Sequence, residues 1–208
     1  ANFYKGGAFM RTYTWKKLEL AILLGLSVTL LWGAVSLHRQ ETLSRKMIRL
    51  HVIANSDSDA DQALKLRVRD AVLTRATELL TQSEDMADAW ARLDTSLPDL
   101  ERAASAACGG AYPVRAELGE AEFPLKEYDG FALPAGRYPA LRVVIGEGAG
   151  RNWWCVVYPP LCTAACTDME QVAIDAGLSG DDVKLITEED GYVLRFRAME
   201  LWQRLRQW

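Results

Sequence analysis

The spacing of apolar residues changes several times along this chain, and each change marks a different predicted element. The first apolar segment is an uncharged run of 18 residues from Leu20 to Leu37. It lies at the lower edge of the ~17–25 residues needed to cross a bilayer, and it exceeds the ~7–15 residues of a typical signal-peptide core. The run therefore predicts an N-terminal hydrophobic helix, either a membrane anchor or a signal peptide cleaved before Leu37 at the small residues Ala34 and Ser36.

Residues 48–80 begin with branched apolar residues and continue at helical spacing. Ile48–Ala54 predicts a short buried strand. The acidic run that follows predicts a turn and a helix cap, formed by Ser58, Asp59 or Asp61. A calcium loop is the alternative, but glutamine stands where such a loop needs glycine. The amphipathic helix that follows has an apolar stripe at Leu64, Val68, Val72, Ala76 and Leu79 or Leu80.

A second apolar series at helical spacing covers residues 86–104. Pro98 falls inside it, and proline removes a backbone donor from a helix interior. We therefore predict two helices, with Ser96 capping the second and Gly109 and Gly110 ending it.

After the glycine pair, the apolar residues alternate with polar ones. Tyr112–Glu122, Ala140–Ile145 and Asn152–Tyr158 predict strands. Residues 123–136 predict a turn-rich bridge. The glycines of residues 146–151 predict a hairpin loop between the last two strands, because a phosphate-binding glycine loop would open a helix instead.

The end of the chain predicts a helix over residues 168–177, strands over 183–186 and 192–197, and a short amphipathic helix over 199–208. This last helix would pack on the sheet or contact a membrane or a partner. The sum is an α+β fold: a single domain with a mainly antiparallel sheet packed by helices, preceded by the hydrophobic helix.

Charge separates the two ends of the chain. Residues 1–39 carry five basic and one acidic side chain, and the rest carries 19 basic and 27 acidic ones. This division predicts a cytoplasmic region over residues 1–17, a transmembrane anchor or signal peptide over 18–39, and an extracytoplasmic domain over 40–208. Met10 is an alternative translation start. An acidic body also argues against nucleic acid as a partner.

Four cysteines fall in the predicted extracytoplasmic domain, at positions 108, 155, 162 and 166. An oxidising compartment permits disulfides, and four cysteines allow three full pairings. We favour Cys155 with Cys162, because Pro159 and Pro160 between them could turn the chain back. Buried free thiols are the alternative.

Motifs for catalysis are scarce. Neither G-x-S-x-G nor H-E-x-x-H occurs, and the two histidines, His38 and His51, form no paired ligand motif. We therefore expect no enzyme activity, metal, cofactor or small-molecule substrate. The rival hypotheses are an envelope hydrolase with Cys155 or Cys162 as nucleophile and His51 as base, and a purely structural envelope protein.

Five residues are candidates for contact with a partner. Successive strand residues point to opposite faces, so either Trp153 or Trp154 faces the core while the other is available as an interface anchor. The alternative is that both are covered within the fold. Asn152 precedes them, and Asn55 with Asp57 forms a second candidate surface, for which helix capping is the alternative.

Three blocks of this sequence resemble the stage II sporulation protein R family. They are residues 48–73, residues 133–162 and the ending ELWQRL. The pattern NSDSxxDQxLKxxVRD together with GxGxNWWCVxxPPLC is too long and specific for a generic structural explanation. Residues 163–182 carry no recognisable motif of the family.

The resemblance implies a signalling protein rather than an enzyme. Members are made in the forespore and exported into the space between the forespore and mother-cell membranes. There the family activates a membrane-embedded aspartic protease, which processes the precursor of sigma factor E in the mother cell. That protease is the partner that the resemblance implies, and the N-terminal segment would contact the membrane.

Overall fold

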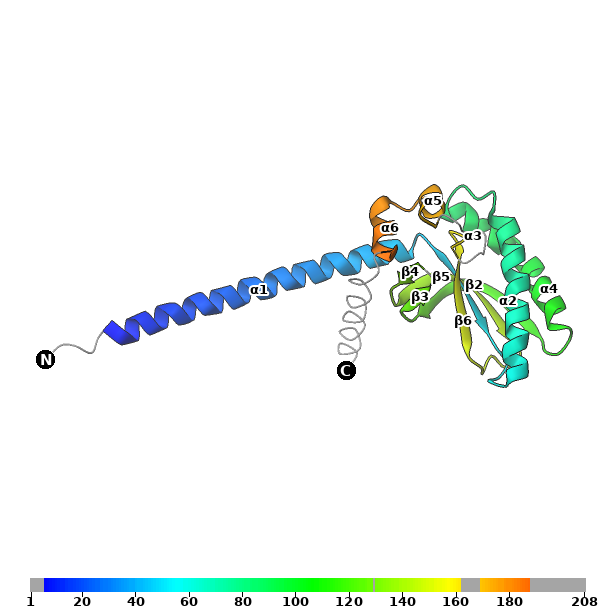
Figure 1. The fold of residues 1–208 in the computed structure, drawn as a ribbon, viewed down its shortest axis with the longest axis horizontal. Helices are drawn as coiled ribbons and strands as arrows, with labels where there is room; N and C mark the ends of the chain where they lie inside the picture. The colour runs from blue at the N-terminus through cyan, green and yellow to red at the C-terminus, as the bar shows by residue number, and fades with distance from the viewer. Residues whose placement is uncertain (1–5, 129, 162–168, 188–208) are drawn as a thin grey trace. The chain divides into compact units, whose positions relative to one another are not determined.

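The computed structural model describes residues 6–128, 130–161 and 169–187, which form parts of two compact units (Figure 1). The first unit is Ala1–Glu41 and the second is Thr42–Trp208. Helix α1, Gly6–Ser44, accounts for the described part of the first unit and enters the second with its last turn.

Helix α1 contains the predicted hydrophobic segment. By length and composition, Trp15–Ser44 suffices to cross a membrane, a test that a signal sequence also passes. Large apolar side chains such as Leu24 and Leu31 are exposed on it. The hydroxyl of Ser27 donates to the carbonyl of Leu23 at 2.8 Å, so this polar group is satisfied within the helix. The prediction of an N-terminal hydrophobic helix is confirmed.

A four-stranded sheet organises the second unit. Its order is β2 (Val114–Phe123), β5 (Gly136–Ile145), β1 (Ile48–Ile53) and β6 (Asn152–Tyr158). The pairs β2–β5 and β1–β6 are antiparallel, and β1–β5 is parallel. The predicted α+β class with a mainly antiparallel sheet is confirmed.

The predicted hairpin between β5 and β6 is wrong, because β1 lies between these strands. The glycine-containing segment 146–151 instead crosses the end of β1. There the amides of Ala149 and Gly150 donate to the carbonyls of Asn55 and Ala54, at 3.1 and 2.9 Å. Strand β1 is buried along nearly its whole length, which suits a central strand.

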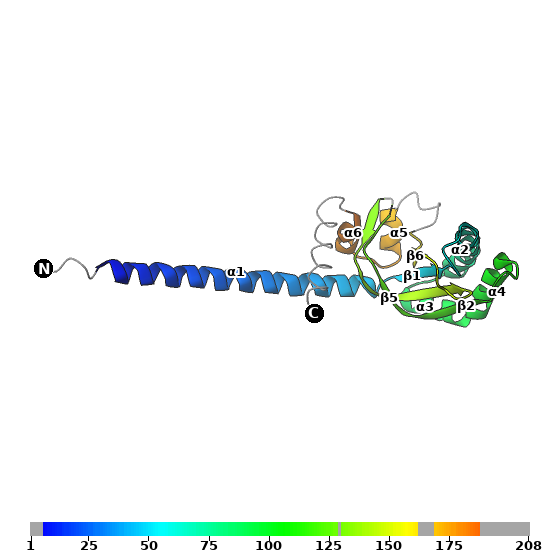
Figure 2. The same ribbon diagram turned by 90° about the horizontal axis from the view of Figure 1, so that it is seen from below.

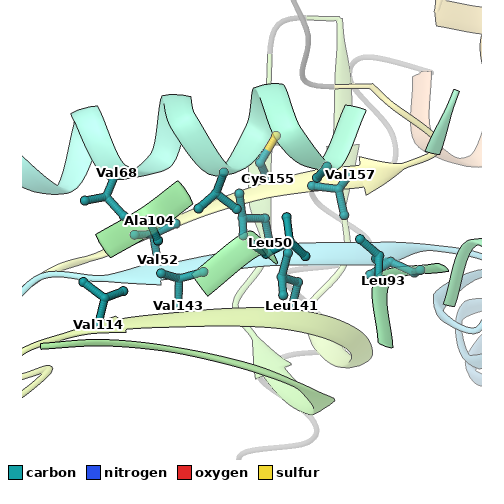
Figure 3. Close-up of a cluster of buried hydrophobic side chains, with 14 of the residues drawn as sticks. Leu50, Val52, Val68, Leu93, Ala104, Val114, Leu141, Val143, Cys155 and Val157 are labelled. Atoms are coloured by element: carbon teal, nitrogen blue, oxygen red, sulfur yellow. The ribbon is translucent and has the colours of Figure 1, made fainter. Parts of the chain in front are cut away.

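Three helices cover one face of the sheet: α2 (Asp59–Leu80), α3 (Met86–Thr95) and α4 (Leu97–Cys108) (Figures 1 and 2). Their apolar stripes meet the inner strand residues in the main core, and Figure 3 shows Val68 of α2 beside this layer. This face is the core face below.

The helix ends follow the predictions in part. Ser58 caps α2 by accepting from the amide of Asp61, at 3.2 Å, and Gly109 ends α4 with a positive φ of 64°. The break between α3 and α4 lies at Ser96 as predicted. Its side chain makes no capping hydrogen bond, so that part of the prediction is wrong; Pro98 in the first turn already lacks one of the amides that a cap would satisfy.

The other face of the sheet, called the second face below, is covered at one end by smaller elements. These are the two-stranded pair β3 (Lys126–Tyr128) and β4 (Phe131–Leu133), and the helices α5 (Met169–Asp175) and α6 (Gly180–Thr187). The pair β3–β4 lies inside the bridge for which the sequence predicted turns alone, and α5 confirms the helix predicted over 168–177.

Helix α6 replaces the strand predicted over residues 183–186. Ser179 and Asp182 cap each other's amides at its start, with N–O distances of 2.9 and 3.2 Å. Val183 and Ile186, three residues apart, are both buried on one side of the helix. The strand predicted over 192–197 and the helix predicted over 199–208 lie outside the described residues.

Candidate functional site

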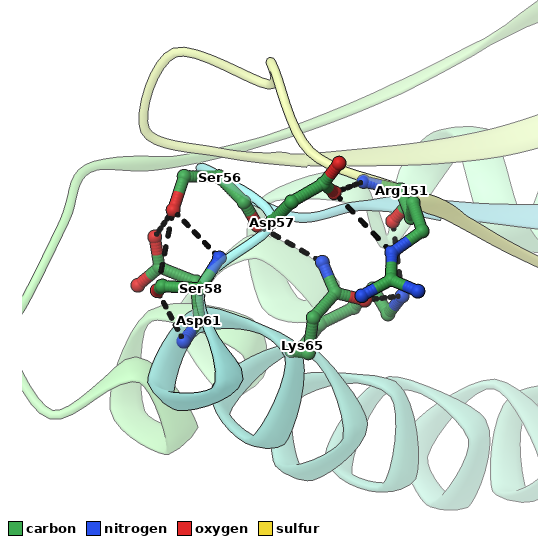
Figure 4. Close-up of polar contacts among 7 residues, drawn as sticks. Ser56, Asp57, Ser58, Asp61, Lys65 and Arg151 are labelled. Atoms are coloured by element: carbon green, nitrogen blue, oxygen red, sulfur yellow. Dashed lines mark hydrogen bonds and ion pairs between the residues drawn. The ribbon is translucent and has the colours of Figure 1, made fainter.

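Two loops that are far apart in the sequence meet at the end of the sheet. They are residues 55–58, which follow β1, and residues 146–151, which follow β5; together they are called the loop pair. Besides the backbone contacts across β1, Asp57 accepts from the amide of Arg151 at 2.6 Å and lies 3.5 Å from its guanidinium Nε (Figure 4). The loop pair thus unites the two sequence motifs in one surface.

Asn55 joins both halves of the loop pair. Its side-chain oxygen accepts from the amide of Glu147 at 3.1 Å, and its side-chain nitrogen donates to Asp61 at 2.9 Å. Asn55 and Asp57 therefore connect the loops, while Ser58 provides the helix cap. The role of Asn55 and Asp57 in contact with a partner stays a prediction.

Asp61 and Lys65 of α2 complete the polar network beneath the loops. The hydroxyl of Ser56 donates to Asp61 at 2.6 Å, and this bond, followed by that from Asn55, lowers the pKa of the Asp61 carboxyl. Lys65 donates to the carbonyl of Arg151 at 2.9 Å, and burial lowers its pKa. The apolar stripe predicted from the sequence does not include Lys65; its position four residues after Asp61, on the same helix face, was the available signal.

Glycine is required where the loops approach most closely. A Cβ at Gly150 would overlap the backbone carbonyl of Ser56, and one at Gly146 would overlap the side chain of Asn55. Gly146 also has a positive φ of 57°. These glycines therefore permit the close contact between the loops.

Trp153 and Trp154 lie on opposite faces of the sheet, as strand alternation predicts. Trp153 packs against the core face, and the guanidinium of Arg69 in α2 lies 4.8 Å from its ring centre. Trp154 lies on the second face and stacks on His51 with ring centres 5.9 Å apart. Both rings are half-buried, and Asn152 is exposed at the start of β6.

A row of polar and aromatic side chains crosses the second face. Strand register aligns Glu117 of β2, Arg142 of β5, His51 of β1 and Trp154 of β6. Glu117 and Arg142 form an ion pair at 2.7 Å. Both ring nitrogens of His51 and the indole nitrogen of Trp154 are buried without a hydrogen-bond partner among the described residues.

Arg49 lies two residues before His51 on the same face and is fully buried. Its Nη2 donates to the hydroxyl of Tyr128 at 2.8 Å. Its guanidinium carbon lies 4.1 Å from the ring centre of Phe123 and 4.8 Å from that of Tyr138. The atoms Nε and Nη1 have no hydrogen-bond partner within the described part of the chain. An arginine inside an apolar strand was visible in the sequence, but its aromatic surroundings were not.

The structure tests the hypotheses of a catalytic cysteine, of free thiols and of a disulfide to different extents. Cys155 is fully buried on the core face and is disulfide-bonded, whereas His51 lies on the second face, so these two cannot form a catalytic pair. Cys108 is a free, buried thiol. The predicted bond of Cys155 with Cys162 lies outside the described residues.

Within the described ranges, no group of three or more histidine, cysteine or acidic side chains is placed to hold a metal.

His51 should make the stability of the second unit depend on pH. Burial lowers its pKa below the ordinary value of 6.5; the nearby Asn152 opposes this effect, and Arg142 and Arg49 add to it. Below pH 6.5 the unfolded chain therefore takes up a proton that the folded chain resists, so stability falls as pH drops from 6.5 toward the lowered pKa and is fully present above 6.5. Urea midpoints of residues 42–208 should show this slope, and His51→Phe should reduce it. Equal slopes in the two proteins would contradict the assignment.

Comparison with known proteins identifies the same family as the two sequence motifs that meet in the loop pair. The family model described as Stage II sporulation protein R matches residues 44–168. Stage II sporulation protein R of Bacillus subtilis (strain 168) is 35% identical over 147 residues, which cover 64% of this chain and 66% of that protein. The matched part thus spans about two thirds of that relative's length. No solved structure matches this chain. The chain belongs to the stage II sporulation protein R family.

Proposed function

We propose that this protein is an exported signalling protein of endospore formation. It is made in the forespore and acts in the space between the forespore and mother-cell membranes. There it activates a membrane-embedded aspartic protease, which then processes the precursor of sigma factor E in the mother cell. The observation that carries the proposal is the family match over residues 44–168, which gives the chain a role in sporulation.

The chemistry of the described residues supports a signal rather than a catalyst. The apolar helix α1 is compatible with secretion or with membrane anchoring. Cys155 and His51, one of the two pairs considered for a hydrolase, lie on opposite faces of the sheet. The side chains of Asn55 and Asp57 accept hydrogen bonds that join the two loops of the loop pair, which suits a rigid contact surface.

The proposal predicts that sigma-factor processing depends on this protein outside sporulation as well. The full chain, the protease and the sigma factor precursor are produced together in a bacterium that does not sporulate. We expect the mature sigma factor on immunoblots when all three are present, and little of it when this chain is omitted. A protease lacking its catalytic aspartates is the control for cleavage by host enzymes.

Two results would count against the proposal. Equal processing with and without this chain would remove its activating role and favour a structural envelope protein. Processing in the presence of the inactive protease that stops when this chain is omitted would point to hydrolysis by this chain instead.

A further inference from the structure

The second face holds a buried cation for which the described residues supply no counter-charge. Arg49 is fully buried, and its Nε and Nη1 have no hydrogen-bond partner among them. The rings of Phe123 and Tyr138 and the hydroxyl of Tyr128 compensate the charge in part. Burying a charge without an ionic partner ordinarily costs several kcal/mol, so a fold that retains one here calls for a reason beyond stability.

The unpaired groups next to Arg49 are mostly donors as well. His51 lies two residues along β1 on the same face, and Trp154 is its cross-strand neighbour. The indole N–H of Trp154 is unpartnered within the described ranges. The ring nitrogens of His51 form no hydrogen bond of regular geometry there, although the Asn152 side chain lies near enough to raise the pKa of His51. His51 and the guanidinium of Arg49 both contact the ring of Phe123, so the three groups form one cluster. We call it the donor cluster.

A carboxylate matches the donor cluster in chemistry. It accepts through two oxygens with about four lone-pair sites, and its charge complements a guanidinium. A neutral amide carries donors of its own and has no charge to offer Arg49. The donor cluster therefore selects an anionic acceptor.

The charge around the donor cluster agrees with this choice. Arg115 and Arg142 stand on the same face of the sheet, and the acid aligned with them, Glu117, is already paired with Arg142. Residues 40–208 as a whole carry 27 acidic against 19 basic side chains. The strand residues beside the donor cluster thus carry a net positive charge on an acidic body, which favours an acidic partner at this position.

We infer that the donor cluster of Arg49, His51 and Trp154 receives an aspartate or glutamate side chain of the protease that this protein activates. This inference rests on the proposed function. The carboxylate meets the half-buried rings of His51 and Trp154 first. Reaching Arg49 requires side chains on this face to move apart, because Arg49 is closed off from solvent.

The test compares conservative variants of the full chain in the three-component processing assay, together with co-purification of the chain and the protease from detergent. Arg49→Met removes the donors at similar volume, and Trp154→Phe removes the indole N–H while keeping a ring. Trp153→Phe on the core face is the matched control. A charge-assisted hydrogen bond corresponds to about 10–100-fold in binding, so Arg49→Met should reduce co-purification at least about tenfold.

Folding is measured on the same preparations. Since Arg49 has no ionic partner within the chain's described ranges, Arg49→Met should melt no lower than the parent. If Arg49→Met does unfold, the binding of Trp154→Phe tests the inference instead. The indole nitrogen of Trp154 forms no hydrogen bond to a described residue, so this variant loses none within the fold. Normal binding and processing by folded Arg49→Met, or by Trp154→Phe in its place, would overturn the inference and leave the proposed function intact.

The carboxylate itself is identified on the partner. Each aspartate and glutamate in the exposed segments of the protease is replaced by its amide. One replacement should weaken binding as Arg49→Met does, and the two changes together should cost no more than either alone. Full binding by every amide variant would overturn the carboxylate assignment. Failure of the unaltered chain to activate the protease would instead overturn the proposed function.

Discussion

Tyr138→Ala is expected to destabilise the second unit more than any other change described here, by about 3–5 kcal/mol. The Tyr138 ring is fully buried, meets Phe123 edge to face at 5.7 Å between ring centres, and lies 4.8 Å from the guanidinium carbon of Arg49. Removing it leaves a cavity directly under a buried cation. Urea unfolding of residues 42–208, followed by tryptophan fluorescence, measures the loss.

The matched variant Tyr138→Phe separates the ring from its hydroxyl. That hydroxyl donates to the carbonyl of Pro134 at 2.8 Å, and burial raises its pKa, so it stays protonated at ordinary pH. Losing this one hydrogen bond should cost about 0.5–1.5 kcal/mol. If Tyr138→Ala cost no more than Tyr138→Phe, the ring would not be supporting the second face.

Gly150→Ala is the second large effect, an expected loss of about 1–3 kcal/mol. The new methyl group would overlap the backbone carbonyl of Ser56, which cannot rotate away as a side chain can. The loops must therefore separate, and the hydrogen bonds from Ala149 and Gly150 across the end of β1 should weaken. Urea unfolding gives the loss in stability, and faster hydrogen exchange at these two amides locates it.

Gly119→Ala is the control for Gly150→Ala. A Cβ at Gly119 in β2 would meet nothing within 4 Å. Since alanine is favoured over glycine in a strand, this variant should be neutral or slightly more stable. Equal losses at the two positions would mean that the loss at Gly150 does not arise from loop contact.

Local patterns predicted the elements whose cause is local. The stripe from Leu64 to Leu80 produced α2 because one helix face carries enough apolar surface to be buried. Pro98 and Gly109 marked helix boundaries because proline lacks a backbone donor and glycine readily adopts the positive φ of 64° found there. Residues 183–186 show the opposite case: they belong to helix α6 rather than to a strand, since four residues cannot distinguish a strand period from a helical one.

The missed features depend on contacts between distant segments. Strand order is one of them: nothing within residues 136–158 reveals that β1 separates β5 from β6. The burial of Lys65 is another, because the carbonyl of Arg151 that accepts its hydrogen bond comes from the second loop. The same is true of Arg49, whose aromatic neighbours come from β2, β3 and β5. The contacts of the candidate residues therefore could not be predicted from the sequence, and their role toward a partner stays a prediction.

The central place of β1 has a consequence for export. In the export that we propose, the chain crosses the membrane from its N-terminal side, so β1 would emerge well before β5 and β6, the two strands that pair with it. Until about residue 158 has crossed, both edges of an apolar strand stay open to wrong partners, a situation that favours aggregation. Helices α2 to α4 emerge in the interval and can shield one side of it. Completion of the sheet is thus a late step, and a nascent chain halted before β6 would lack the surface that carries Trp154.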